Sequence, residues 1–430
     1  MILEEHLPDL ESRFTDGPFL RPDYRGYNFM QIPALVDALF GIGDAACPFG
    51  PEVLPRVVER PRNVVLLMID GFGYNHWLRY GEGYPFLRSM LSQGSLMPIT
   101  AVFPSTTSAS VTAIGSGLTP QQHGLMEWHL YLEELDQVIV TLPFKSLGRG
   151  IPPEELAARG VDPHLLFNGE SHATRLRRQG VVPHSFLGRG YAGGAFTSLI
   201  HAGAEVHAYG SPAELIVMLR EALALSSEPS YFYVYWDGMD VISHRYEPHS
   251  AYFDAELNSL THLLQTELLE RVDSRVAEST VLLVTSDHGH VPVNPAETVY
   301  LNAFPEIESA LAVSSNGRRI HPWGSARDLF LQVDPLRLKD TVAALRHRLH
   351  GIADVRLSQN EADRRLFGFG EEHPRFRSRI GNVLILPYEH RTVSYQYPGL
   401  EKTGLRGMHG GMSREEMLTV LGFATLSELM

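Results

Sequence analysis

The chain has 430 residues, of which 44% are hydrophobic and 20% charged, with a formal net charge of −14. This length exceeds the usual ceiling for one domain, so we expect one large domain with an insertion, or two domains. The negative charge argues against a broad nucleic-acid-binding surface, which needs clustered lysine and arginine. A small anionic substrate is compatible with it if bound metal ions supply positive charge locally.

Sequence features that report on location favour the cytoplasm. No apolar run approaches the roughly 18 residues that a transmembrane helix needs, so no membrane association is expected. The first residues, MILEEHLPDLESRF, lack the basic and apolar regions of a signal peptide. Cys47 is the only cysteine, which excludes internal disulfides and suits a reducing compartment. Most histidines are scattered, and His6, His172 and His184 are predicted to be surface groups.

Strand-like and helix-like segments alternate along the chain. Residues 63–70 form a short, continuous, β-branched run that predicts a buried strand, and residues 85–94 have helical spacing and stop at Gly94. The same reasoning predicts strands at 95–104, 231–236 and 281–286 and helices at 211–225 and 249–273. This rhythm predicts an α/β fold with a mostly parallel central sheet and helices on both faces.

The less regular stretches are interpreted as additions to this core. Residues 1–60 are expected to form an N-terminal extension that packs on it, and residues 61–294 the core itself, with a lid insertion near 121–205. Residues 295–400 are expected to form a second insertion, a small α+β cap. Residues 401–430 would then return to the core.

Three apolar runs end in side chains that bind metal ions. Asp70 follows the strand predicted at 63–70, Asp287 and His288 follow the one at 281–286, and Asp240 and His244 come shortly after 231–236. Ligands in open α/β sheets bind beyond the carboxyl ends of strands, so these groups should converge. Taken alone, Asp70 would be interpreted as a helix cap or turn residue. Together the residues indicate a two-metal phosphohydrolase.

Other residues in these fragments leave alternatives open. Asp240 and His244 would face one direction on a helical turn, but Asp237 is a competing ligand that the spacing does not exclude. His290 lies two residues after His288, and side chains at that spacing point apart on an extended chain. We therefore expect His290 to be structural or to support a ligand. His409 lies between glycines and as an isolated histidine would not be assigned a role.

At this point the chain resembles the alkaline phosphatase superfamily, and most closely its nucleotide pyrophosphatase/phosphodiesterase branch. The matching motifs are MIDGF at 68–72, FPSTT at 103–107, GLTPQQHG at 117–124, DVISH at 240–244, SDHG at 286–289 and HGG at 409–411. The resemblance implies that a threonine nucleophile opens a helix and bridges two metal ions, and Thr107 occupies that place. It also implies that Asp240, His244 and His409 hold one ion, and that Asp70, Asp287 and His288 hold the other with Thr107.

The residues around Thr107 suit this role. SASVTAIGSG has helical spacing, so Thr107 would lie in the first turn, where backbone N–H groups favour an alkoxide and a phosphoryl oxygen. A threonine hydroxyl needs activation by a metal ion or a base. Helix capping is the simpler interpretation of the hydroxyl cluster, and Thr106 is the alternative nucleophile.

One departure from the branch concerns substrate recognition. Relatives carry an asparagine after the HG pair, and here Trp128 has the matching place. Trp128 and Tyr131 would stack on a base or an aromatic leaving group, with packing beneath the lid as the alternative.

The sequence therefore predicts a metal-dependent hydrolase of phosphodiester or pyrophosphate bonds in small, nucleotide-type phosphorylated substrates, with a covalent phosphothreonine intermediate. A phosphomonoesterase or phosphonate hydrolase of the same superfamily is the alternative. The Asp and His ligands favour two divalent ions, zinc first and manganese or iron as alternatives. The oligomeric state does not follow from the sequence.

Overall fold

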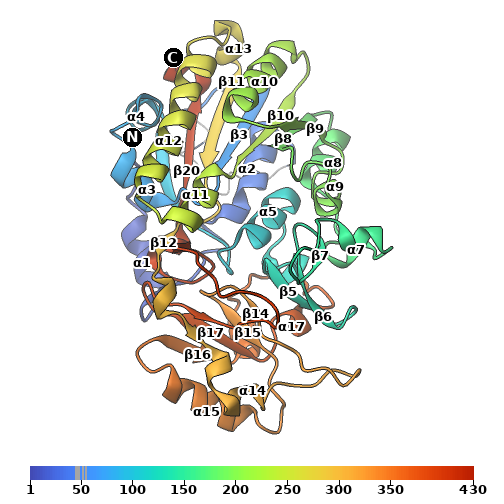
Figure 1. Ribbon diagram of the computed structural model, residues 1–430. Coiled ribbons are helices and arrows are strands. Elements are labelled where there is room, and N and C mark those ends of the chain that lie inside the picture. Colours follow the sequence, from blue (N-terminus) through green and yellow to red (C-terminus); the bar gives the residue numbers. More distant parts are fainter. Residues whose placement is uncertain (44–48, 51–52, 54–55) are drawn as a thin grey trace.

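The computed structural model describes residues 1–43, 49–50, 53 and 56–430, so Cys47 lies outside the described residues. Figure 1 shows an upper body built around a large twisted sheet and a lower body formed mainly by residues 295–400. Both chain termini lie in the upper body (Figure 1). Within the described residues, no helix is long and apolar enough to cross a membrane.

The upper body has a mostly parallel sheet. Among the described residues it has seven strands, in the order β4-β20-β11-β3-β10-β8-β9. Strands β11, β3, β10, β8 and β9 are parallel, whereas β20 runs antiparallel to both β11 and β4. The strands span Asn63–Ile69 (β3), Ser95–Thr100 (β4), Val182–Gly188 (β8), Glu205–Tyr209 (β9), Ser230–Trp236 (β10), Thr280–Thr285 (β11) and Leu418–Thr425 (β20).

Helices cover both faces of this sheet (Figure 1). One group packs together from α4, α10 and α12, and a second group packs around α5 from α2, α8 and α9. Because parallel strands are covered on both faces, β3, β10 and β11 are buried along their whole length. The helices of the upper body span Ile32–Leu39 (α2), Tyr74–Tyr80 (α3), Pro85–Ser92 (α4), Thr107–Ser116 (α5), Pro120–His123 (α6), Glu155–Ala158 (α7), His172–Arg178 (α8), Ala195–Ile200 (α9), Pro212–Leu225 (α10), Gly238–Tyr246 (α11), Ala251–Leu263 (α12), Ser274–Glu278 (α13) and Arg414–Met417 (α18).

The predicted α/β fold is confirmed, with two differences in element length. The strand predicted at 95–104 ends at Thr100, because the chain there turns toward α5. The helix predicted at 249–273 is α12 followed by a π-helical segment, Leu264–Leu269. Its apolar side chains Phe253, Leu257 and Leu260 are buried, as the spacing predicted.

The segment near 121–205, which was expected to be a lid insertion, contains part of the central sheet. Its last part contains β8, which pairs with β10, and β9 begins at Glu205 and pairs with β8. Both belong to the central sheet. These strands lack a continuous apolar run, because Pro183 and His184 interrupt β8 and the edge strand β9 has exposed residues. The part outside the sheet has its own short antiparallel strands, His129–Leu132 (β5), Gln137–Val140 (β6) and Lys145–Ser146 (β7).

The lower body has an α+β arrangement. Its main sheet, in the described chain, has four strands in the order β14-β15-β17-β16. Helix α15 packs on β16, and their apolar side chains form a core separate from that of the central sheet. The elements span Val299–Tyr300 (β13), Pro305–Glu308 (α14), Trp323–Gly324 (β14), Leu329–Leu331 (β15), Leu338–Arg348 (α15), Ala353–Arg356 (β16), Ser358–Asp363 (α16), Phe376–Arg379 (α17), Val383–Pro387 (β17) and Val393–Ser394 (β18).

The two ends of the chain lie against the central sheet. Near the N-terminus, Leu7–Phe14 (α1) is followed by the two-residue strands Thr15–Asp16 (β1) and Phe19–Leu20 (β2), and the apolar residues of this segment join the main core. After the lower body the chain returns through Gly407–Met408 (β19), which pairs with Val291–Pro292 (β12), and enters the sheet as β20. This return places His409 beside the strand ends.

His172 differs from its predicted surface location. It is buried at the start of α8, and its Nε2 lies 2.8 Å from an Asp37 carboxylate oxygen. A histidine can be buried at low cost when a partner of this kind satisfies its ring nitrogen. His184 is partly buried.

Candidate active site

The metal-binding side chains predicted from the sequence meet at the carboxyl ends of the central parallel strands. Asp70 follows β3 directly, and Asp287 and His288 follow β11. Helix α11, which carries Asp240 and His244, follows β10. Because β3, β10 and β11 are parallel neighbours, their carboxyl ends deliver these residues to the same place.

The first group of ligands, which we name the inner cluster, consists of Asp70, Asp287 and His288. The His288 Nε2 atom lies 3.2 Å from Asp287 Oδ2 and 3.5 Å from Asp70 Oδ1. The Thr107 hydroxyl lies 3.3 Å from the same Nε2 atom. Two carboxylates, an imidazole and a hydroxyl thus share one small volume.

Two oxygens of the inner cluster lack hydrogen-bond partners. Asp287 Oδ1 accepts from the backbone N–H groups of Gly71 and His288, and Asp70 Oδ2 accepts from the Tyr235 hydroxyl. The other oxygens, Asp70 Oδ1 and Asp287 Oδ2, are buried and have no hydrogen-bond partner among the described residues. Buried carboxylate oxygens are costly unless paired or metal-bound. This donor set therefore fits a divalent cation.

The raised pKa of Asp70 agrees with a divalent cation at the inner cluster. Burial, together with the charges of Asp287 and Asp240, raises the pKa of Asp70 well above its ordinary value. The hydrogen bond from Tyr235 acts in the opposite direction but does not compensate. A cation between the carboxylates would remove the repulsion and keep both ionised.

The second group, which we name the outer cluster, consists of Asp240, His244, His290 and His409. Asp240 and His244 lie one turn apart on α11, as the spacing predicted, with Asp240 Oδ1 3.4 Å from His244 Nε2. The same oxygen lies 2.7 Å from His290 Nε2 and 3.5 Å from His409 Nε2. Asp240 is thus the shared centre of three imidazoles.

Backbone carbonyls fix the orientation of three imidazoles at the site. The Nδ1 atoms of His244, His288 and His409 lie 2.7 Å, 3.1 Å and 2.9 Å from the carbonyl oxygens of Gly407, Gly289 and Ser105. A carbonyl oxygen can only accept, so each Nδ1 carries the proton. Each Nε2 then has a free lone pair directed into its cluster, which is how metal-binding histidines are oriented in proteins.

Charges in the outer cluster act differently from those of the inner one. Burial disfavours the charged form of Asp240, but His244, His290 and His409 outweigh it and hold the pKa of Asp240 well below its ordinary value. Burial lowers the pKa of His290 to about 4, although Asp240 opposes this shift. The Asp240 carboxylate therefore stays ionised, and His290 Nε2 lies within hydrogen-bond distance of it.

The two clusters are adjacent. The rings of His288 and His409 stack with centroids 3.6 Å apart, so a ligand of one cluster touches a ligand of the other. Two-metal hydrolases hold their ions about 3.5–4 Å apart. The two clusters therefore adjoin, as the two metal positions of such a site must.

Hydrogen bonds distinguish Thr107 from its neighbours in the hydroxyl cluster. Thr106 is the N-cap of α5: its hydroxyl accepts from the Ala109 N–H and donates to the Met126 carbonyl. The Ser105 hydroxyl donates to the Gly411 carbonyl. Thr107 is the first helical residue, and its hydroxyl faces His288. Thr107 is thus the hydroxyl that adjoins the inner cluster.

Two glycines let backbone segments approach closely around the clusters. A Cβ atom at Gly289 would lie 1.9 Å from the Glu415 carbonyl oxygen, so only glycine fits after His288. Gly410 has a φ of +115° and a Cβ there would lie 2.6 Å from an Asp328 oxygen. The conformation that follows His409 therefore requires glycine.

The remaining sequence candidates lie outside both clusters. Asp237, the competitor of Asp240, precedes α11 and is in neither cluster. Trp128 is 43% exposed, whereas Tyr131 is 7% exposed, lies against Trp323 and donates its hydroxyl to Asp136. These contacts match the packing alternative for Tyr131. A substrate contact for Trp128 or Tyr131 stays a prediction.

The sequence analysis missed two contributors. Tyr235 lies on β10 and donates to Asp70 across the β3–β10 pairing, a contact that the apolar run 231–236 does not reveal. Glu127 and Asp328 are fully buried and interact with each other, and Ser325 links Asp328 to the His409 carbonyl. The sequence shows each of these two acidic residues only as a single charge among apolar neighbours. It does not show that they pair, because they are distant in sequence.

Comparison with known proteins identifies the family. A family model described as type I phosphodiesterase/nucleotide pyrophosphatase matches residues 64–412. A search of curated proteins found no match. Solved structures with the same fold include murine ectonucleotide pyrophosphatase/phosphodiesterase 5, in an inactive form in complex with AMP, with 14% identity, a TM-score of 0.62 and coverage of 84% of this chain and 87% of that chain. The human protein of the same name has 15% identity, a TM-score of 0.59 and the same coverage.

The match to the family model spans both clusters, from β3 to the segment after His409. It implies a two-metal-ion active site, and the inner and outer clusters have the residue types for one and adjoin each other. The chain therefore belongs to the type I phosphodiesterase/nucleotide pyrophosphatase family and is a hydrolase.

Proposed function

We propose that this protein hydrolyses phosphodiester or pyrophosphate bonds of nucleotide-type substrates through a phosphothreonine intermediate at Thr107. The observation that carries the proposal is the Thr107 hydroxyl at the N-terminus of α5, 3.3 Å from His288 of the inner cluster. The murine relative of known structure binds AMP, and its inactive form carries alanine in place of a threonine. Both facts agree with a nucleotide substrate and a threonine nucleophile.

Each cluster would hold one divalent ion. Asp70, Asp287, His288 and Thr107 would hold one, and Asp240, His244 and His409 the other, with zinc preferred because imidazole and carboxylate ligands suit it. The bound ions supply Lewis-acid stabilisation of the phosphoryl oxygens and lower the pKa of the nucleophile. His290 would orient Asp240 through its 2.7 Å hydrogen bond.

The chain's own residues account for the covalent step. The Thr107 oxygen, having lost its proton to solvent, forms a bond to phosphorus while the bond to the leaving group breaks, and the leaving group takes a proton from water. The N-terminal N–H groups of α5 face the phosphoryl oxygens and stabilise their charge. Water then attacks phosphorus, releases the phosphorylated product and restores the Thr107 hydroxyl. Thr106 keeps the helix end in place as its cap.

A preference for diesters over monoesters follows from the available cations. A monoester dianion carries one more charge than a diester and needs an additional fixed cation. Arg327, one candidate for that cation, is fully buried and makes two hydrogen bonds of 2.9 Å and 2.8 Å to the Glu416 carboxylate. Lys402 lies over the Tyr300 ring, 4.6 Å from its centroid. Both of these cations already have partners, and the other two candidates, Arg245 and Arg406, are exposed.

The substrate class is tested by comparing kcat/KM for p-nitrophenyl thymidine monophosphate and p-nitrophenyl phosphate with the same metal supply. We expect the diester to be the better substrate. An advantage for the monoester would replace the proposal by a phosphomonoesterase of the same superfamily.

The metal requirement is tested separately. Exhaustive chelation, verified by elemental analysis, should abolish hydrolysis, and zinc should restore it better than manganese or iron. Full turnover by the metal-free protein would contradict the two-metal proposal.

A further inference from the structure

A third group of metal-ligating side chains lies away from the active site, on the strands β8 and β9. His184, Glu205 and His207 have ligand atoms that lie within 4.8 Å of one another. In the parallel pairing of the two strands, His184 is directly opposite Glu205, and His207 is two residues further along β9. Side chains two residues apart on a strand share a face, so all three project from the same face of the sheet.

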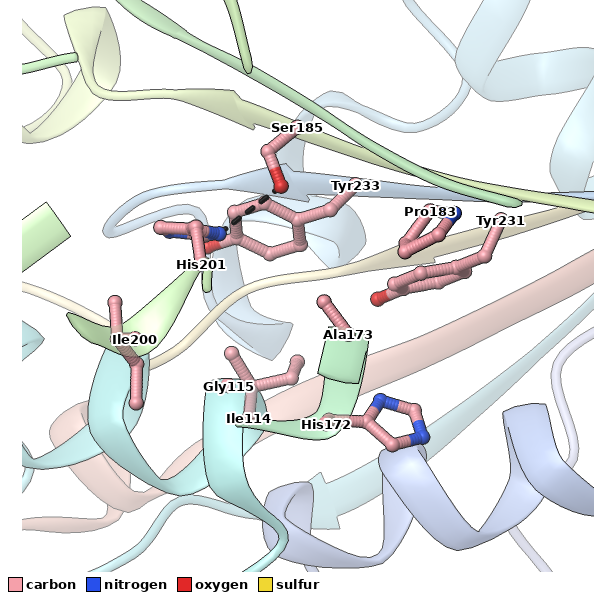
Figure 2. Close-up of a pocket in the computed structure, with 10 residues that line it drawn as sticks. All are labelled: Ile114, Gly115, His172, Ala173, Pro183, Ser185, Ile200, His201, Tyr231 and Tyr233. Atoms are coloured by element: carbon pink, nitrogen blue, oxygen red, sulfur yellow. Dashed lines mark hydrogen bonds between the residues drawn. The ribbon is translucent and has the colours of Figure 1, made fainter. Parts of the chain in front are cut away.

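The opposite face of the same strands is closed by packing. Figure 2 shows a small pocket there, lined by Pro183 and Ser185 from β8 and by Tyr231 and Tyr233 from β10, with the Ser185–His201 hydrogen bond at one side. His184 lies between Pro183 and Ser185 and therefore points away from this pocket. The three-residue group is thus separate from the pocket as well as from the active site.

Aromatic rings hold both imidazoles of the group in place. The His184 ring stacks on Phe232 with centroids 4.8 Å apart and an interplanar angle of 10°. The His207 ring stacks on Phe186 with centroids 4.4 Å apart and an angle of 12°. Both phenylalanines are fully buried core residues. The histidines therefore have little freedom to lose when they bind a ligand.

The spacing of the ligand atoms suits a tetrahedral ion. His184 Nδ1 lies 3.1 Å from His207 Nε2 and 3.5 Å from Glu205 Oε2. Zinc bonds to nitrogen or oxygen of about 2.0–2.1 Å place neighbouring tetrahedral ligands roughly 3.3–3.4 Å apart. The observed distances bracket that value.

We propose that His184, Glu205 and His207 form a third, non-catalytic binding site for a divalent transition-metal ion such as zinc. The ion would be bound by His184 Nδ1, His207 Nε2 and Glu205 Oε2, with water at the remaining coordination position. It would cross-link β9 to β8 and so stabilise the edge strand of the sheet. Arg177 is the competing partner, since its Nη2 lies 3.8 Å from Glu205 Oε1, but this contact leaves Oε2 to the site.

The experiment counts zinc ions per chain. The protein is stripped with a chelator, dialysed against zinc and analysed for bound metal. We expect three equivalents in the unmodified protein and two in His207→Gln, with hydrolysis of p-nitrophenyl thymidine monophosphate unchanged. Glu205→Gln, at a side chain that is 55% exposed, provides a second variant with little risk to folding and the same expected loss.

Val206→Thr is the matched control, because Val206 lies between the two β9 ligands, is 44% exposed and points to the other face. It should keep all three equivalents. Equal zinc content in the unmodified protein, His207→Gln and Glu205→Gln would overturn the proposal. If the active-site clusters bound no zinc, one equivalent that depends on His207 would still support this site, so the two proposals fail separately.

Discussion

The inner and outer clusters adjoin but are constructed differently. The inner cluster comes from the ends of two neighbouring strands, and its carboxylates are buried with two unpartnered oxygens. The outer cluster comes from α11, from the residue just before β12 and from the residue just after β19, and its single carboxylate is surrounded by three imidazoles. The strand register thus sets the inner geometry, whereas long-range loop contacts set the outer one.

This difference has an electrostatic consequence. Without a cation, burial and then the charges of Asp287 and Asp240 raise the pKa of Asp70, so the inner cluster disfavours two ionised carboxylates. In the outer cluster the neighbouring imidazoles outweigh burial and hold the pKa of Asp240 well below its ordinary value, so its single carboxylate stays ionised without a cation. We therefore expect the metal to be more important for the stability of the inner cluster than for that of the outer one.

The largest expected effect concerns Thr107, the hydroxyl that adjoins the inner cluster. Thr107→Ala should lower kcat by about 10³-fold or more, because it removes the nucleophile. Thr107→Ser should keep part of the activity. Mass spectrometry of acid-quenched turnover should place phosphate on the peptide that contains FPSTTSAS.

Thr106→Ala is the matched control for this experiment. Its hydroxyl caps α5, so the variant should lose about 1 kcal/mol of stability and keep its phosphorylation. Normal turnover in Thr107→Ala together with loss in Thr106→Ala would show that the other hydroxyl is the nucleophile.

The next prediction tests the electrostatic contrast directly. Asp287→Asn should place an amide nitrogen at the position of Asp287 Oδ2, which has no hydrogen-bond partner among the described residues. The amide carries no charge to repel Asp70, so the metal-free variant should unfold at a higher temperature than the metal-free unmodified protein. Asp240→Asn should unfold at a lower temperature, because it removes the carboxylate that His244, His290 and His409 share. Both variants should lose activity.

Calorimetry of the three stripped proteins measures this difference. A shift of about 1–3 kcal/mol in each direction is the scale of a buried charge change. Shifts of the same sign in both variants would contradict the contrast between the clusters.

Much of the inner cluster could be predicted from the sequence, because its ligands directly follow buried strands. The runs at 63–70 and 281–286 have the continuous apolar composition of parallel strands, and the carboxyl ends of such strands meet. The spacing of Asp240 and His244 likewise predicted that they lie one turn apart on a helix. Predictions failed where an element carries no such pattern: β9 is the edge strand and β8 is its neighbour, and both contain polar residues.

His290 was expected to point away from His288, because the two residues are two apart on an extended chain. The centroids of the His290 and His288 rings lie 5.9 Å apart, and the two rings contact different carboxylates. This arrangement directs His288 into the inner cluster and His290 onto Asp240 of the outer one. The sequence could not show this, because it depends on where α11 lies relative to the end of β11.

A smaller effect is expected from the hydrogen bond that orients the inner cluster. Tyr235→Phe removes the hydroxyl that donates to Asp70 Oδ2 and should weaken metal binding by about 10–100-fold. The ring remains in place within β10, so the fold should persist. Titration of the stripped protein with zinc measures the change, and unaltered affinity for both ions would show that the hydroxyl does not support the site.

The smallest effect on the active site itself is expected from the buried acidic pair behind the outer cluster, whose titration makes the stability of the protein depend on pH. Burial, with a contribution from the Glu416 charge, raises the pKa of Asp328 from 3.8 to about 7, although hydrogen bonds from Glu127 and Ser325 act against the shift. Between these two values the folded protein holds a proton that the unfolded chain has released. Stability should therefore fall as the pH rises from about 4 to about 7.

Asp328→Asn removes this titration. The loss of unfolding free energy between about pH 4 and about pH 7 should then be smaller by an amount on the order of a few kcal/mol. A residual slope of the same sign should remain, because burial still raises the pKa of Glu127 in this variant. Denaturant unfolding of the stripped proteins across this range provides the measurement, and identical slopes would contradict the assignment. Since Ser325 connects Asp328 to His409, zinc affinity should change at the outer cluster and not at the inner one.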